Sequence, residues 1–178
     1  MSNQNRLSCN TAANSLRDRD KHTGFEFAIA PPHAEEAERL RDLHELSVLD
    51  TEADERFDRV TRLVAQTLDI PSVLVSLVDA NRQWFKSMCN FGAQETNRDV
   101  AFCAHALNQP NDILVIPNAD EDARFKNNPL VVNPPNIKAY AGVVLRSHRS
   151  LPLGTLCGID PERSSVPLDT LEPFLLHI

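Results

Sequence analysis

The sequence predicts an α+β fold with a central antiparallel sheet. Two amphipathic helical patterns stand before the first strand pattern, five strand patterns follow, and one short helical pattern interrupts them. Helices and strands that are grouped along the chain in this way are typical of α+β domains, in which helices cover the faces of one sheet.

Composition indicates one domain behind a disordered leader. The chain has 178 residues, 42% hydrophobic and 24% charged, as in ordinary globular proteins. Residues 1–33 carry too few apolar side chains to offset the entropy of ordering them, so we expect disorder there. Residues 34–178 are expected to form the domain, with a C-terminal helix that the end of the chain truncates.

Charge and hydropathy argue against two classes of partner. The formal net charge is −7, whereas a nucleic-acid-binding face requires clustered basic side chains. No stretch approaches the ~18 consecutive apolar residues that suggest a membrane span, and the N-terminus lacks an apolar signal segment. We therefore expect a cytoplasmic protein that binds neither nucleic acid nor membranes.

The first predicted helix covers residues 34–46, where Ala37, Leu40 and Leu43 recur at helical spacing. This apolar stripe must be covered by the sheet, by the closing helix or by a second subunit. Because Pro173 interrupts the closing helix, a homodimer is expected to cover it.

A second helix is predicted to begin at a capping box formed by residues 51–54 and to end near residue 69. Its apolar face consists of Phe57, Val60, Val64 and Leu68.

Strands are predicted over residues 72–78, 83–88, 113–116, 138–146 and 153–160. The first is apolar on both alternating faces, as in a central strand covered on both sides, and a turn at residues 79–81 returns the next as its antiparallel neighbour. Asp99 is predicted to cap a short helix that runs to residue 107. Residues 118–136 form a long irregular segment of the kind that often carries function.

Chemically capable side chains gather between Arg82 and His105, which points to a pocket. This stretch holds the single Trp and two of the four Cys. Its spacing fits no catalytic or metal site, because Cys103 and His105 on one helix point about 200° apart. The sequence therefore favours binding over chemistry, with no metal and an unknown cofactor.

The chain carries, in this order, the blocks SVLVSLVD at residues 72–79, QWFKS at 83–87, RDVAFCAHAL at 98–107, DARF at 122–125, YAG at 140–142 and LGTLCGID at 153–160. Together they resemble GAF domains, of the subgroup found at the N-terminus of bacterial sensor histidine kinases and diguanylate cyclases. Several blocks in one order are more specific than any single motif.

The resemblance implies a sheet of five to six antiparallel strands, with N- and C-terminal helices on one face. A short helix and loops would cover a ligand cavity on the other. It also implies small-molecule binding, a homodimer through the terminal helices, and signalling to an output module. Since the chain has no kinase His box and no cyclase Gly-Gly-Asp/Glu motif, a separate kinase or cyclase protein is expected to supply the output.

The expected ligand-binding residues are those that the resemblance places around this cavity: Trp84, Lys86, Phe102, Cys103, His105, Phe125 and Tyr140. No catalytic residue is expected.

Each of these residues also has a plain structural reading. Trp84 and Tyr140 either stack on a ligand ring or fill the core. His105 is a hydrogen-bonded core residue or a ligand contact, and Phe125 is a lid or a plug of the core edge. Two functional alternatives stay open: a thiol-dependent free methionine sulfoxide reductase using Cys103, and a non-binding dimerisation module or remnant of a longer sensor protein.

Overall fold

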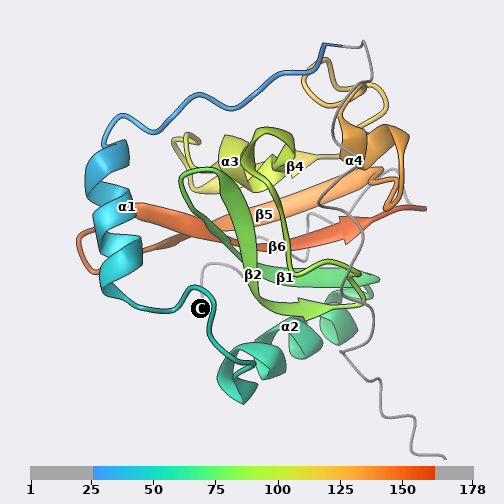
Figure 1. The fold of residues 1–178 in the computed structure, drawn as a ribbon. Helices are drawn as coiled ribbons and strands as arrows, with labels where there is room; N and C mark the ends of the chain where they lie inside the picture. The colour runs from blue at the N-terminus through green and yellow to red at the C-terminus, as the bar shows by residue number, and fades with distance from the viewer. Residues whose placement is uncertain (1–25, 163–178) are drawn as a thin grey trace, which may run out of the picture.

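A computed structural model describes residues 26–162 of the chain. Within this range six strands form one antiparallel sheet in the order β3-β2-β1-β6-β5-β4 (Figure 1). Their bounds are β1 Ser72–Val78, β2 Arg82–Cys89, β3 Glu95–Asn97, β4 Ile113–Ile116, β5 Ala139–Arg146 and β6 Pro152–Asp160. The predicted α+β fold with a central antiparallel sheet is confirmed.

Helices cover both faces of this sheet (Figure 1). On one face lie the two helices that precede the strands, α1 (Glu36–Glu45) and α2 (Glu55–Leu68). On the other lie the 3-10 turn η1 (Arg98–Val100), α3 (Phe102–Ala106) and α4 (Pro129–Val132). The predicted closing helix over residues 168–178 falls outside the described residues.

The central strand forms as predicted. Every residue of β1 is buried, as expected for a strand that is covered on both faces. Its two faces enter separate cores: Val73 and Val75 pack under α2, whereas Leu74 and Val78 pack under α3. The pairing of β1 with β2 shifts register between Val75 and Ser76, which marks a bulge.

Local chemistry at the helix ends differs from the prediction. The N-cap of α2 is Asp54, whose side chain accepts a hydrogen bond from the Arg56 backbone N–H at 2.9 Å, so the predicted capping box beginning at Thr51 does not form. Asn97, not Asp99, caps η1 through the Asp99 backbone N–H. Each Asx side chain caps the backbone N–H two residues ahead of it, so α2 begins later than the pattern indicated and η1 begins earlier.

The buried side of α1 carries Arg39, Asp42 and Leu43, while Ala37 is exposed. Arg39 has no exposed surface and donates a hydrogen bond from Nη1 to the Val78 carbonyl at 2.6 Å. The sheet therefore covers the predicted stripe only at its Leu43 end, and charged side chains attach the rest of α1.

Residues 26–33 were expected to belong to a disordered leader, but they lie across the α3 face as an extended strap. The Ala28 N–H donates to the Arg124 carbonyl at 3.2 Å, and Asn108 Nδ2 donates to the Pro31 carbonyl at 2.9 Å. Phe27 and Ala30 pack against the core beneath. These contacts order a short apolar segment that the polar composition of residues 1–33 as a whole did not reveal.

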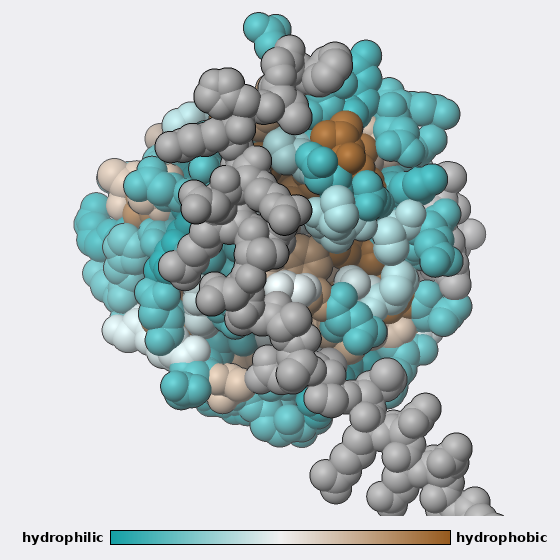
Figure 2. All heavy atoms as spheres, turned by 45° about the vertical axis from the view of Figure 1, so that its right-hand side comes forward, coloured by the Kyte–Doolittle hydropathy of each residue, from teal (hydrophilic) through white to brown (hydrophobic). Residues whose placement is uncertain are grey.

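The visible surface in Figure 2 is mainly hydrophilic, with hydrophobic atoms confined to a small patch and to recesses between polar side chains. Among the described residues the large hydrophobic side chains that stay exposed are scattered singly: Ile29, Leu46, Leu63 and Val132. Single exposed apolar residues of this kind are ordinary and mark no interface by themselves.

Candidate functional site

Five of the seven expected ligand-binding residues meet on the α3 face of the sheet. The rings of Phe102 on α3 and Phe125 in the 118–136 segment stack with centroids 4.0 Å apart and planes 12° apart. The ring centroid of Tyr140 on β5 lies 5.3 Å from that of Phe102. The His105 ring packs edge-on against Phe125, with the centroids 4.8 Å apart. Cys103 lies beneath them, 3.4 Å from the Tyr140 hydroxyl.

The expected metabolite cavity is absent from this cluster. The space left among its side chains is about 20 Å³, close to the volume that admits one water molecule. Phe102, which lines this space, and Phe125, which stacks on Phe102, are 3% and 0% exposed. In this conformation the α3 face is a packed core.

His105 joins the strap to this core. Its Nε2 lies 3.0 Å from the Ala28 carbonyl, so Nε2 carries the proton and donates. Burial lowers the pKa of His105, and the hydrogen bond to Ala28 opposes this. A neutral, hydrogen-bonded imidazole fits the structural reading of this residue.

The other two expected residues, Trp84 and Lys86, lie on the opposite face of the sheet, because alternate residues of β2 point to opposite sides. Trp84 packs with Leu43, Leu77 and Leu153 beneath α1. The structure therefore does not bring all seven residues into one pocket.

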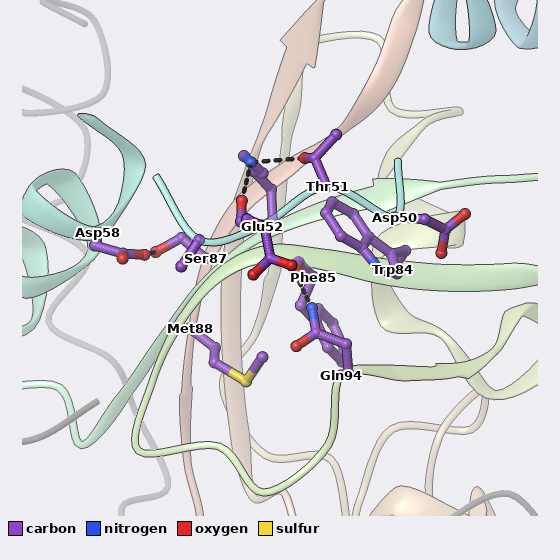
Figure 3. A pocket seen from close by; sticks show the side chains of 11 residues that line it. Asp50, Thr51, Glu52, Asp58, Trp84, Phe85, Ser87, Met88 and Gln94 are labelled. Atoms are coloured by element: carbon purple, nitrogen blue, oxygen red, sulfur yellow. Dashed lines mark hydrogen bonds between the residues drawn. The ribbon is translucent and has the colours of Figure 1, made fainter. Parts of the chain in front are cut away.

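A pocket of about 340 Å³ lies beside these two residues. It is lined by the 50–53 loop, the first turn of α2, β2 and the β2–β3 connection: Asp50, Thr51, Glu52, Ala53, Asp58, Trp84, Phe85, Lys86, Ser87, Met88 and Gln94. Figure 3 shows Asp58 and Ser87 on one side, Trp84 and Asp50 on the other, and Thr51 and Glu52 between them.

Lys86 is the cation of this pocket. It is 7% exposed, and its Nζ donates to Thr51 Oγ1 at 2.8 Å and to the Glu52 carbonyl at 2.7 Å. Nζ also lies 5.5 Å from the centroid of the Phe57 ring. None of the carboxylates in residues 26–162 forms an ion pair with it. Both of its oxygen partners are neutral, and one of its three N–H donors is left for a further acceptor.

Two of the carboxylates that line the pocket have hydrogen-bond partners. Asp50 accepts hydrogen bonds from Arg82 at 2.6 and 2.9 Å, and these hydrogen bonds lower the pKa of Asp50 against a smaller opposing effect of burial. Asp58 accepts the Ser87 hydroxyl at 2.6 Å. The sequence prediction missed Asp50 and Asp58 because it interpreted the neighbouring residues 51–54 only as a helix cap.

The described residues include no group of three or more His, Cys, Asp or Glu side chains that could hold a metal ion. In the same part of the chain, none of the helices is both long enough and apolar enough to cross a membrane.

Helices and an extended N-terminal segment pack over the two faces of a six-stranded antiparallel sheet, and this arrangement defines an α+β domain. The chain belongs to the GAF domain family: residues 52–175 match the family model.

Sequence comparison identifies a curated relative of this chain. The chain is 35% identical over 133 residues to a cyclic di-GMP phosphodiesterase of Pseudomonas aeruginosa, an alignment that covers 74% of this chain and 22% of the relative. The chain thus spans about a fifth of the length of this curated relative.

Two solved structures share the fold. One is the type II free methionine-R-sulfoxide reductase of Thermoplasma acidophilum, with TM-score 0.53, 12% identity, and 71% of this chain and 83% of that one covered. The other is the GAF domain of an Acinetobacter phosphoenolpyruvate-protein phosphotransferase, with TM-score 0.53, 15% identity, and coverage of 79% and 85%. At these identities the likeness concerns the fold alone.

Proposed function

We propose that this chain is a cytoplasmic regulatory domain of a cyclic di-GMP signalling protein, and that it binds a small polar molecule in the pocket beside Lys86. The signalling context is supported by the 35% identity to the Pseudomonas phosphodiesterase. The ligand part follows from one observation: a nearly buried lysine ammonium in a 340 Å³ pocket, whose hydrogen-bond partners within residues 26–162 are two neutral oxygen atoms.

The volumes of the two faces support this location. Pockets for small molecules typically measure about 300–1,000 Å³, a range that includes the Lys86 pocket and excludes the 20 Å³ space under α3. A ligand under α3 would first have to displace the stacked Phe102 and Phe125 rings. A ligand beside Lys86 needs no such rearrangement.

The same volumes argue against a methionine sulfoxide reductase. Cys103 is 1% exposed beneath the aromatic cluster, and 20 Å³ does not admit an amino acid beside its sulfur. NADPH-coupled turnover of free methionine sulfoxide is therefore expected to be absent. Turnover that Cys103→Ser abolishes would restore the reductase assignment.

Native mass spectrometry of the protein purified from its own host tests the ligand. A co-purified small molecule is expected in the wild type and in Lys126→Met, an exposed lysine used as the control, and is expected to be lost in Lys86→Met. Retention in Lys86→Met with loss in Phe102→Ala would move the ligand to the α3 face. No co-purified molecule, and no heat of binding with cyclic nucleotides or cell extract, would leave a non-binding dimerisation module.

The homodimer and the separate kinase or cyclase output are part of the same proposal. A subunit contact on the side of α1 and α2 would bury Leu46 and Leu63, which are 54% and 52% exposed. Sedimentation that shows only monomer at high concentration would remove the dimer.

A further inference from the structure

Two thiols of the α3-face core lie within reach of each other. The sulfur atoms of Cys103 on α3 and Cys157 on β6 are 3.7 Å apart, although 54 residues separate them in the sequence. Cys89 lies on the other face of the sheet, where it pairs with Val73. A disulfide needs about 2.05 Å between sulfurs, so a small approach of α3 to β6 would join Cys103 to Cys157.

Hydrogen bonds make the two thiols chemically unequal. Thr155 Oγ1 and the Tyr140 hydroxyl donate to Cys103 Sγ at 3.0 and 3.4 Å. Burial raises the pKa of Cys103, but hydrogen bonding to its sulfur, to which Cys157 contributes most, outweighs burial and lowers the pKa. The hydrogen bond to Cys103, followed by burial, raises the pKa of Cys157. Cys103 is therefore the more acidic thiol of the pair, which favours it as the nucleophile.

The small space beside this pair contains buried polar atoms with no partner. Cys103 and Cys157 both line this space. Gln83 and Thr96, which are 6% and 7% exposed, line it as well. Gln83 Oε1 and Thr96 Oγ1 make no hydrogen bond within the described part of the chain. Because buried polar atoms are normally satisfied, this space suits a very small polar guest, and its 20 Å³ admits nothing much larger than water.

We propose that Cys103 and Cys157 form a peroxide-oxidised thiol pair, with hydrogen peroxide entering this space and a reversible disulfide as the product. The Cys103 thiolate attacks one peroxide oxygen; an S–O bond forms, the O–O bond breaks, and the leaving hydroxide takes up a proton as water. Cys157 then attacks the Cys103 sulfur; the S–S bond forms, the S–O bond breaks, and the second hydroxide leaves with the Cys157 proton as water. Two thiols and one peroxide thus give one disulfide and two waters.

This disulfide would fix α3 to the central sheet. The α3 face would then stay closed until a thiol reduces the disulfide. The inference goes beyond the proposed ligand, because the Lys86 pocket lies on the opposite face and contains neither cysteine.

The test treats the reduced full-length chain with excess hydrogen peroxide, blocks remaining thiols, and maps peptides by mass spectrometry. We expect a peptide pair linked through Cys103 and Cys157, lighter by two hydrogen atoms and released by dithiothreitol. The Cys89→Ser control should form the same link. In Cys157→Ser, Cys103 should stop at a sulfenic acid that dimedone traps.

Any other product pattern overturns the inference. Unlinked, still-reduced Cys103 and Cys157 after peroxide would make the pair an inert core contact. A Cys103 link to Cys9 or Cys89, or over-oxidation of Cys103 without a link to Cys157, would refute the pairing. The experiment contains no ligand, so its failure is distinct from failure of the Lys86 site.

Discussion

Replacing Phe102 by Ala tests whether the α3 face is a core or a displaceable cover. Phe102 is 3% exposed and stacks on Phe125 at 4.0 Å. Truncating a buried Phe to Ala costs about 3–5 kcal/mol, of which stacking accounts for about 0.5–1.5 kcal/mol. Since a chain of this size loses about 2–4 °C of melting temperature per kcal/mol, the loss should be evident in any thermal scan.

Urea unfolding of the wild type, Phe102→Ala, Phe125→Ala and the double variant would measure this cost. The double-mutant cycle should return a coupling of about 0.5–1.5 kcal/mol between the rings. Val132→Ala, on the exposed side of α4, is the control and should stay within about 0.5 kcal/mol of wild type. A loss below about 1 kcal/mol in Phe102→Ala would refute the packed core and favour a ligand cavity under α3.

Three further outcomes follow from the geometry. Burial raises the pKa of Glu36, but hydrogen bonds from Arg39 and Arg98 outweigh it and lower the pKa from 4.5 to about 2. The stability that Glu36 adds should therefore be complete above pH 4.5 and vanish as the pH falls toward 2. Urea unfolding of the wild type and Glu36→Gln across this range measures it. A difference in unfolding free energy between the two proteins that does not change with pH would contradict the prediction. A Cβ on Gly154 would lie 1.9 Å from the Ser76 carbonyl oxygen, so Gly154→Ala should lower the stability by at least about 1–3 kcal/mol. The control Gly92→Ala should be near neutral, because a Cβ there would meet no atom within 4 Å. Equal losses of stability in thermal unfolding of the two variants would refute the close approach at Gly154. Asp54→Ala removes the α2 cap and should cost about 1 kcal/mol in the same assay, and an unchanged stability would show that the cap contributes nothing.

The strand framework was accessible from the sequence because its signals are local. Residues 72–78 and 113–116 are continuous apolar runs bounded by turn residues, and β1 and β4 have these same bounds. Strand β3 was missed because its three residues are too few to show alternation, and it forms only by pairing with Arg82–Trp84 of β2.

The site was harder to predict because its faces and volumes depend on tertiary packing. Alternation along β2 was enough to put Trp84 and Lys86 on one face and Phe85 on the other. The sequence did not say which face α3 would cover, so Trp84 and Lys86 were grouped with it wrongly. Whether Phe102 lines a cavity or fills it depends on the position of Phe125. Phe125 lies in a long irregular segment, whose conformation no periodic sequence pattern predicts.

The charged contacts of α1 show how the two sides of the sheet are joined. Glu36 on α1 accepts a hydrogen bond from Arg98 of η1 at 2.5 Å, and Arg98 also donates to the Asp79 carbonyl at 3.1 Å. Arg39, one turn further along α1, binds Glu36 and the Val78 carbonyl. Because η1 leads directly into α3, Arg98 joins the segment that enters α3 to Glu36 on α1. The segment that leads into α3 and the helix α1 are thus connected through two arginines and one carboxylate.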